Sequence, residues 1–112
     1  MHELSIAQSI VELAENVALG EKADSINSID IEIGALSGVV IDALEFAMEV
    51  TIKNTKLENA KINFLKKKGI ASCKNCGFHF ETINLLALCP KCNQANFKII
   101  DGKQLRVKSL II

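Results

Sequence analysis

Residues 73–92 read Cys73-Lys-Asn-Cys76-Gly-Phe-His-Phe-Glu-Thr-Ile-Asn-Leu-Leu-Ala-Leu-Cys89-Pro-Lys-Cys92, and they contain all four cysteines of the chain. The cysteines form two CxxC pairs. Two thiolates three positions apart bind one cation from a tight turn, and two such turns complete a tetrahedron. Gly77 tolerates the positive φ that such a turn favours, and Pro90 stiffens the second pair. The spacing therefore predicts a four-cysteine zinc site at Cys73, Cys76, Cys89 and Cys92.

Other uses of cysteine fit this spacing less well. A thioredoxin-like redox site uses one CxxC pair, and disulfides need an oxidising compartment. The first residues lack the basic leader of a signal peptide, and Glu12 and Glu15 interrupt the apolar run that follows. We therefore expect a cytoplasmic protein, in which the thiols are reduced. Four thiolates leave no coordination position for water, so the predicted zinc is structural. His79 lies close to Cys76 in sequence, but a half-exposed strand histidine is the more ordinary interpretation.

The segment around the cysteines differs in composition from the rest of the chain. Residues 70–101 contain every cysteine, the only proline and three of the five phenylalanines. After the turn signal Asp101-Gly102, an alternating strand pattern runs from Gln104 to Lys108 and ends in apolar residues. A final apolar strand needs a sheet to join. We therefore expect a zinc-ribbon insertion at 70–101 inside a main domain of residues 1–69, completed by 102–112.

Two earlier strands and two helices are expected in the main domain. The first strand pattern alternates Ile29, Ile31 and Ile33 with polar residues, as in a half-buried strand with one solvent-exposed face. Residues 60–64 repeat that pattern. Helical periodicity indicates a second helix over residues 41–53. Its expected buried positions are Ile41, Leu44, Met48 and Ile52. The predicted fold class is α+β: a small three-stranded sheet with two helices, plus the inserted zinc-ribbon module.

The first helix is expected over residues 5–19, with a signal at each end. Ser5 and Gln8 fit a capping box, and Gly20 is a natural C′ residue. The expected buried face consists of Ile6, Ile10, Leu13 and Val17. Because this helix begins so close to the start of the chain, we expect the first three residues to be ordered.

The first three residues themselves carry metal donors. The free α-amine, the amide nitrogen between Met1 and His2, and the imidazole Nδ1 chelate one metal in fused five- and six-membered rings. The Glu3 amide nitrogen or carboxylate is a candidate fourth donor. Square-planar nitrogen ligation suits Ni(II) or Cu(II), and the positive end of the helix favours the deprotonated donors. Any chain that begins Met-His has these atoms, so the chemistry alone also allows a solvated histidine without a metal.

Charge and motif content narrow the function classes. Thirteen Lys and Arg balance thirteen Asp and Glu, which argues against a nucleic-acid surface, and no apolar run is long enough for a membrane span. No Ser/His/Asp set or phosphate loop is present, so we expect no enzyme. The alternative is a zinc-ribbon adaptor that binds nucleic acid or a ribosomal or protein surface. The basic residues behind that alternative are Lys66, Lys67, Lys68, Lys74 and Lys91.

Several motifs together resemble the HypA/HybF hydrogenase maturation factors. The opening Met1-His2-Glu3-Leu4-Ser5-Ile6-Ala7-Gln8-Ser9-Ile10 is similar to theirs, as are residues 33–39 and 43–47. The paired CxxC motifs and the ending Leu105-Arg106-Val107-Lys108-Ser109 also match. Many members have proline in the segment where this chain has Ile41, which affects only the expected start of the second helix.

The resemblance implies a nickel metallochaperone with a zinc-ribbon insertion. Members of the family deliver Ni(II) to the large subunit of [NiFe]-hydrogenase together with a hydrogenase maturation nickel GTPase, and in some organisms they also serve urease accessory proteins. By resemblance, the nickel site falls on Met1, His2 and Glu3. The four zinc ligands fall on the cysteines named above, with Ni(II) as transported metal and Zn(II) as structural metal. Neither a membrane nor a nucleic acid is an expected partner.

Overall fold

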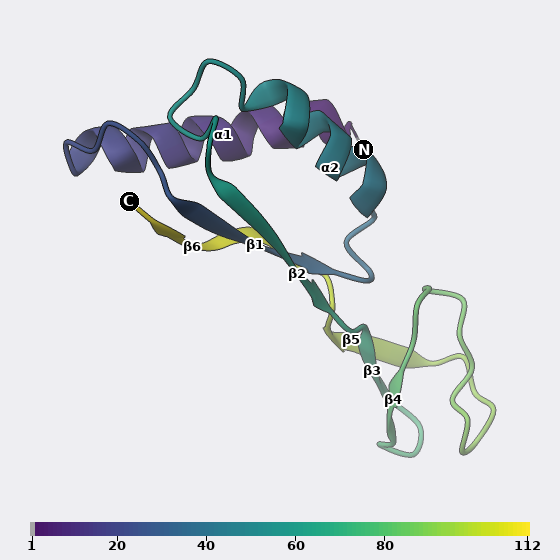
Figure 1. The fold of residues 1–112 in the computed structure, drawn as a ribbon. Coiled ribbons are helices and arrows are strands. Elements are labelled where there is room, and N and C mark those ends of the chain that lie inside the picture. Colours follow the sequence, from purple (N-terminus) through teal and green to yellow (C-terminus); the bar gives the residue numbers. More distant parts are fainter. Residues whose placement is uncertain (1) are drawn as a thin grey trace.

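A computed structural model describes residues 2–112 and shows two small sheets joined end to end, with both helices packed on the first (Figure 1). The molecule is elongated, with extents of 55 × 24 × 17 Å and a radius of gyration of 17.3 Å. A compact chain of this length has a radius of gyration of about 13 Å. The elongation arises because the cysteine-containing sheet extends beyond the main sheet instead of packing on it.

The main sheet has the strand order β2-β1-β6. Its central strand β1 (Ser28–Gly34) pairs parallel to β2 (Lys61–Lys67) and antiparallel to β6 (Leu105–Ile111). Ile29, Ile31 and Ile33 are fully buried against the helices, as their alternation predicted. The expected α+β fold with a three-stranded sheet and two helices is therefore confirmed.

Helix α2 (Ile41–Thr51) follows its sequence pattern closely. Leu44 and Met48 are buried in the main core, and Ile41 and Ile52 pack against it. The helix begins at Ile41 without proline. Val40 is its N-cap residue and has extended backbone.

Helix α1 (Glu3–Gly20) begins earlier than expected. Its N-cap is His2, with extended backbone and no capping side chain, and the Ile6 N–H donates to the His2 carbonyl. Ser5 lies inside the first turn, so the predicted capping box with Gln8 is wrong. In place of a local cap, the first turn has a tertiary contact: the Val40 N–H donates to the Glu3 carboxylate.

The C-terminus of α1 also differs from expectation. Gly20 is the last helical residue, and Lys22 takes the left-handed position with φ of 58°. The Lys22 N–H donates to the Leu19 carbonyl and the Ala23 N–H to the Ala18 carbonyl, which is the Schellman pattern. Gly20 as C′ residue was therefore wrong, because the C′ position falls two residues later, at Lys22.

The buried face of α1 was partly mispredicted. Leu13 and Val17 are 50% and 43% exposed, whereas Ile10 is buried. The side chains that α1 buries are mostly small: Ala7, Val11, Ala14 and Ala18 are buried beside Ile10. Small side chains let α1 pack closely against α2 in the main core, so the alanine stripe is buried in place of the larger one.

The polar face of β1 is less exposed to solvent than its alternation predicted. Glu32 is only 3% exposed, although it lies on the face away from the helices. Its Oε2 accepts a hydrogen bond from the Arg106 guanidinium at 3.3 Å. A central strand is shielded by its neighbours on both sides, and the arginine provides the paired charge that a buried carboxylate requires.

The second sheet contains the cysteines and has the order β4-β3-β5. It consists of β3 (Ile70–Cys73), β4 (His79–Glu81) and β5 (Phe97–Asp101). Its own small core contains Ala71, Phe80 and two cysteines, with the Phe80 and Phe97 rings edge-to-face at 5.7 Å. The chain then returns to the main sheet as β6, so in sequence the second sheet lies between strands β2 and β6 of the first.

Three glycines form the junction between the two sheets. A Cβ on Gly34 would lie 2.0 Å from the Gly102 carbonyl oxygen, and a Cβ on Gly69 would lie 2.3 Å from the Thr82 oxygen. Gly102 has φ of 107° and accepts a hydrogen bond from the Leu36 N–H at 2.7 Å. The backbones touch directly here, which leaves no space for side chains.

Candidate metal centre

The four cysteines lie in two backbone turns of the same construction. In the first turn, the Gly77 N–H donates to the Cys73 carbonyl at 2.9 Å, and Gly77 has φ of 78°. In the second, the Asn93 N–H donates to the Cys89 carbonyl at 2.8 Å, and Asn93 has φ of 61°. The prediction that Gly77 adopts positive φ is confirmed.

A further pair of hydrogen bonds completes the equivalence of the turns. The Cys73 N–H donates to the Phe78 carbonyl, and the Cys89 N–H donates to the Gln94 carbonyl, both at 2.9 Å. Asn93 therefore has the role of Gly77 in the second turn. Sequence reasoning missed it, although asparagine is the non-glycine residue that best tolerates this conformation.

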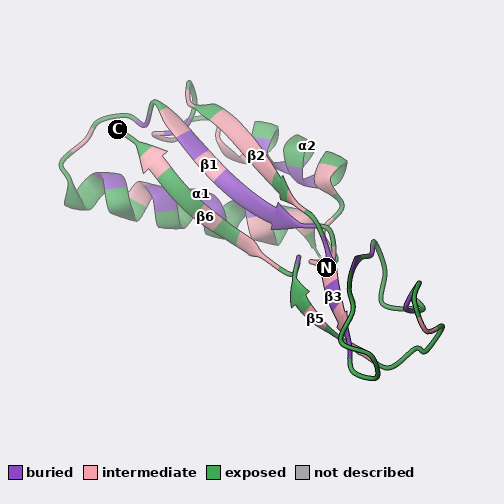
Figure 2. Cartoon of the chain, turned by 90° about the horizontal axis from the view of Figure 1, so that it is seen from below, coloured by how far each residue is buried: buried purple, intermediate pink, exposed green. Residues whose placement is uncertain are grey.

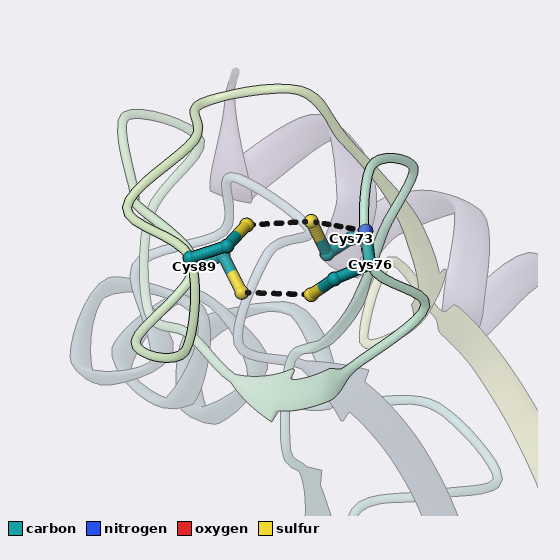
Figure 3. A group of neighbouring side chains, drawn as sticks. Cys73, Cys76 and Cys89 are labelled. Atoms are coloured by element: carbon teal, nitrogen blue, oxygen red, sulfur yellow. Dashed lines mark hydrogen bonds between the residues drawn. The ribbon is translucent and has the colours of Figure 1, made fainter.

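The two turns bring the four sulfur atoms together (Figure 3). Cys73 and Cys76 face Cys89 across the cluster, and all four sulfurs lie within 4.8 Å of one another. The Cys73 and Cys92 Sγ atoms are 3.5 Å apart, and those of Cys76 and Cys89 are 3.7 Å apart. Cys73 and Cys89 are buried, Cys92 is half-buried and Cys76 is exposed.

These separations fit a shared metal ion better than disulfides. A tetrahedron with metal–sulfur bonds of about 2.3 Å has sulfur–sulfur edges of about 3.8 Å. A disulfide bond is about 2.05 Å long, and all four cysteines are free. The donor set of four thiols on two rigid turns suits zinc, which takes tetrahedral sulfur ligation.

Two of the thiols have strongly shifted pKa values. The Cys76 backbone N–H points at the Cys73 sulfur from 3.5 Å and lowers the pKa of Cys73 to about 6, against the opposing effect of burial. The pKa of Cys76 is raised to about 11: the Phe78 backbone N–H favours its thiolate, but partial loss of solvation and the contacts with the neighbouring cysteine thiols outweigh that contact. One thiolate in the cluster therefore disfavours the next until a cation neutralises them.

Residues around the cluster support it without joining it. His79 lies exposed on β4, and among residues 2–112 the group close enough to share a metal consists of cysteines alone. Asn75 was not foreseen: its Nδ2 donates to the Cys92 sulfur at 3.7 Å. The Nζ of Lys91, the residue directly before Cys92, lies 5.9 Å from the centroid of the Phe78 ring.

The N-terminal candidate site lies in the other part of the fold. Met1 falls outside the described residues, so its part in the site is not seen. His2 is exposed at the start of α1, and the Glu3 carboxylate accepts a hydrogen bond from the Val40 N–H at 3.3 Å. This bond lowers the pKa of Glu3. The Glu3 side chain thus links the start of α1 to the start of α2.

His2 and Glu3 border an apolar hollow of about 400 Å³ between the helices. The remaining lining residues are Leu4, Ala43, Phe46, Ala47 and Val50. Phe46 is 68% exposed, which is unusual for a large aromatic side chain on an ordered helix. The exposed histidine thus lies beside a surface that another protein can cover.

A family model described as "Hydrogenase/urease nickel incorporation, metallochaperone, hypA" matches residues 1–112. The chain belongs to this family. It is 46% identical over 112 residues to the hydrogenase maturation factor HypA of Parabacteroides distasonis, covering all of this chain and 97% of that one. It is 41% identical over 120 residues to the HypA of Methanococcus vannielii, again covering all of this chain and 97% of the relative.

Solved HypA structures share the fold. The solution structure of the nickel metallochaperone HypA from Helicobacter pylori superposes with a TM-score of 0.68 at 26% identity, covering 100% of this chain and 97% of that one. A second solution structure of a HypA protein gives 0.70 at 25% identity, over 100% and 96%. The family resemblance read from the motifs is confirmed, and these findings favour a HypA nickel metallochaperone over the zinc-ribbon adaptor.

Proposed function

We propose that this nickel metallochaperone binds Ni(II) through the Met1 amine, the His2 amide nitrogen and the His2 imidazole. The supporting observation is that His2 is exposed at the N-cap of α1, with extended backbone ahead of the helix. The Glu3 carboxylate is held by the Val40 N–H. The fourth nickel position then falls to the Glu3 amide nitrogen, because N–H groups in the first helical turn have no helical acceptor.

A chain terminus suits a metal that must be passed on. Few protein groups hold the ion, so a receiving protein displaces them one at a time by ligand exchange. Both the amine and the imidazole must lose a proton to bind the metal, so binding weakens as the pH falls. The apolar hollow beside His2 offers the receiving protein a contact surface next to the metal.

The four-cysteine cluster, in this proposal, holds Zn(II) permanently through Cys73, Cys76, Cys89 and Cys92. Its sulfur positions already match a tetrahedral site, and a closed shell of thiolates leaves no place for substrate. The small core of the ribbon contains only a few apolar side chains, so metal binding supplies most of its stability, on the order of 10 kcal/mol. Residues 70–101 then form a separate folding unit inside residues 1–69 and 102–112.

The proposed setting rests on membership of the nickel-incorporation family and on the state of the cysteines. The partners are the nickel GTPase of hydrogenase maturation and the [NiFe]-hydrogenase large subunit, with urease accessory proteins in organisms that contain urease. Four reduced thiols at metal-binding distances support a cytoplasmic location. Neither helix of residues 2–112 has the length and apolar character to cross a membrane. The protein carries nickel without catalysing a reaction of its own.

The decisive experiment compares nickel binding by the native chain with binding by a chain that has one residue added before Met1. The extra residue displaces the free amine from His2 without changing any side chain. We expect only the native, zinc-loaded protein to bind one nickel tightly with a square-planar absorption band. Equal binding by both proteins would place nickel elsewhere.

Two variants separate the metals in the same experiment. His2→Ala is expected to abolish tight nickel binding and leave the fold and the zinc content intact. Cys73→Ala is expected to lose zinc and unfold the ribbon, while α1 keeps its helical circular dichroism. Unchanged zinc content in Cys73→Ala would overturn the four-cysteine assignment independently of the nickel result.

A further inference from the structure

The backbone at His2 keeps two of the proposed nickel donors apart. His2 has φ of −90° and ψ of 105°. With standard bond lengths and angles, this ψ places the amide nitrogens of His2 and Glu3 about 3.3 Å apart. Two donors at right angles, each about 2 Å from a metal ion, are only about 2.8 Å apart. One ion therefore cannot bind both nitrogens while His2 keeps this conformation.

Rotation about one bond removes the conflict. At ψ of roughly 0°, the same bond lengths place the two amide nitrogens about 2.6 Å apart, on the same side of the chain. The change is a rotation of about 100° about the Cα–C bond of His2. With its φ unchanged, His2 then lies in the bridge region, which is allowed and borders the helical region. Binding through both nitrogens thus requires a new conformation of one residue.

The helix side of that bond is held in place. The Ile6 N–H donates to the His2 carbonyl at 3.2 Å, and the Val40 N–H donates to the Glu3 carboxylate at 3.3 Å. Figure 2 places the start of α1, near the mark N, beside the segment that leads into α2. The His2 carbonyl and the Glu3 nitrogen both lie on the helix side of the rotating bond. The rotation therefore preserves these contacts and moves the amide nitrogen and the side chain of His2.

The side chain that moves borders the apolar hollow between the helices. His2 lines this hollow of about 400 Å³ together with Phe46 and Val50 of α2. A rotation of about 100° carries the His2 Cβ about 2 Å around the Cα–C bond, and it carries the imidazole further. Phe46 and Val50 stay with their helix. The hollow consequently has a different border after the rotation.

We propose that nickel binding turns His2 from its extended N-cap conformation into the bridge region, and that this rotation changes the border of the apolar hollow. The inference rests on the proposed nickel site and adds a conformational signal to it. His2 is then both a ligand and the hinge. The nickel-loaded chain and the empty chain present different surfaces where the receiving protein is proposed to make contact.

The test measures ψ of His2 by NMR in the zinc-loaded full chain, before and after addition of equimolar Ni(II). Square-planar Ni(II) is diamagnetic, so the signals stay sharp. The three-bond coupling between the His2 Hα and the Glu3 nitrogen depends on ψ and should change on loading. The ring signals of Phe46 and the methyl signals of Val50 should shift in the same titration. The Ile6 amide should keep its protection from hydrogen exchange.

Two variants of Glu3 separate the rotation from other effects. Glu3→Pro fits the first helical position, but proline has no amide N–H to give up and keeps the preceding residue out of the helical region. Glu3→Ala is the matched control, because it removes the same carboxylate and keeps the amide nitrogen. We expect Glu3→Ala to show the square-planar band and the shifts at the hollow, and Glu3→Pro to lose both. Helical circular dichroism should be equal in the two variants.

The possible failures are distinguishable. A square-planar band with an unchanged His2 coupling, or the same band in Glu3→Pro, would overturn the rotation and leave the nickel site in place. A changed coupling without shifts at Phe46 and Val50 would refute the effect on the hollow. If the chain with one residue added before Met1 binds nickel as the native chain does, the proposed function and this inference both fail.

Discussion

Single residues with left-handed backbone show where local sequence signals succeed and where they do not. Gly77 was predictable because glycine is the ordinary residue at positive φ. Asn93 and Lys22 adopt the same backbone region although neither is glycine. For Asn93 the second CxxC turn was the available clue, but at Lys22 nothing in the local sequence marks the helix end. The surrounding hydrogen bonds impose the conformation there.

Lys22 supplies a stability prediction. A β-carbon at φ of 58° costs about 1–2 kcal/mol, and glycine removes that cost at a loss of about 0.5 kcal/mol in backbone entropy. Lys22→Gly should therefore raise the free energy of unfolding of the main domain by about 1 kcal/mol and its melting temperature by about 5 °C. The measurement is thermal unfolding followed by helical circular dichroism.

The adjacent residue provides the control. Glu21 has φ of −90°, which any residue adopts, so Glu21→Gly gains nothing and loses backbone entropy. It should lower stability by about 0.5 kcal/mol. Stabilisation by both substitutions, or by neither, would show that strain at Lys22 is not the cause.

The buried faces of helices and strands were predicted well where one apolar stripe clearly dominates the sequence pattern. The alternation of β1 and the apolar stripe of α2 both describe the side that is buried. In α1 two stripes compete, and residue size decides between them. Ala14 and Ala18 belong to the buried core, whereas Leu13 and Val17 are about half exposed. Only packing in the folded core distinguishes these alternatives, so the sequence pattern of one helix was not sufficient.

The bond between Glu3 and Val40 ties the two helices together at the N-terminal site. The Val40 N–H lowers the pKa of Glu3, so this link contributes stability above pH 4.5 and loses it as the pH falls through the lowered value. Val40→Pro removes the donor, and its φ of −84° is compatible with proline. We expect the pKa of Glu3 to rise toward its ordinary range in the nickel-free variant, since the largest of the contacts that lower it is lost.

The measurement is a pH titration of the Glu3 carboxyl by NMR, with Val40→Ala as the control. That substitution keeps the N–H and should leave the pKa of Glu3 low. A low pKa of Glu3 in Val40→Pro as well would mean that other groups hold the carboxylate. The link between the helices would then have to be reassigned.

For the molecule as a whole, the order of its parts was predictable but their arrangement was not. The cysteine segment differs in composition, and the apolar strand after Asp101 needs a sheet, so an insertion followed from the sequence. The four cysteines converged as their spacing required. Nothing in the spacing indicated that the ribbon would extend the main sheet lengthwise, because that depends on backbone contacts at Gly34, Gly69 and Gly102.

We expect the glycine junction to hold the two sheets in one orientation. Substituting Gly102 therefore tests what fixes the placement of the two metal sites relative to each other. A Cβ on Gly102 would lie 2.5 Å from the Gly69 Cα, and its φ of 107° is strained for any other residue. Gly102→Ala should cost about 2 kcal/mol or more and open the junction. The zinc content should stay the same, because the cysteine turns lie elsewhere.

Residual dipolar couplings measure this directly. In the native protein, the amides of both sheets should fit one alignment tensor, and in Gly102→Ala the ribbon should need a second. The matched control is Gly20→Ala at the end of α1, where a Cβ meets nothing within 4 Å and alanine should stabilise the helix by about 0.5 kcal/mol. A single tensor and unchanged stability in Gly102→Ala would show that the orientation is set by β2 and β6 running on into the second sheet, and not by the glycines.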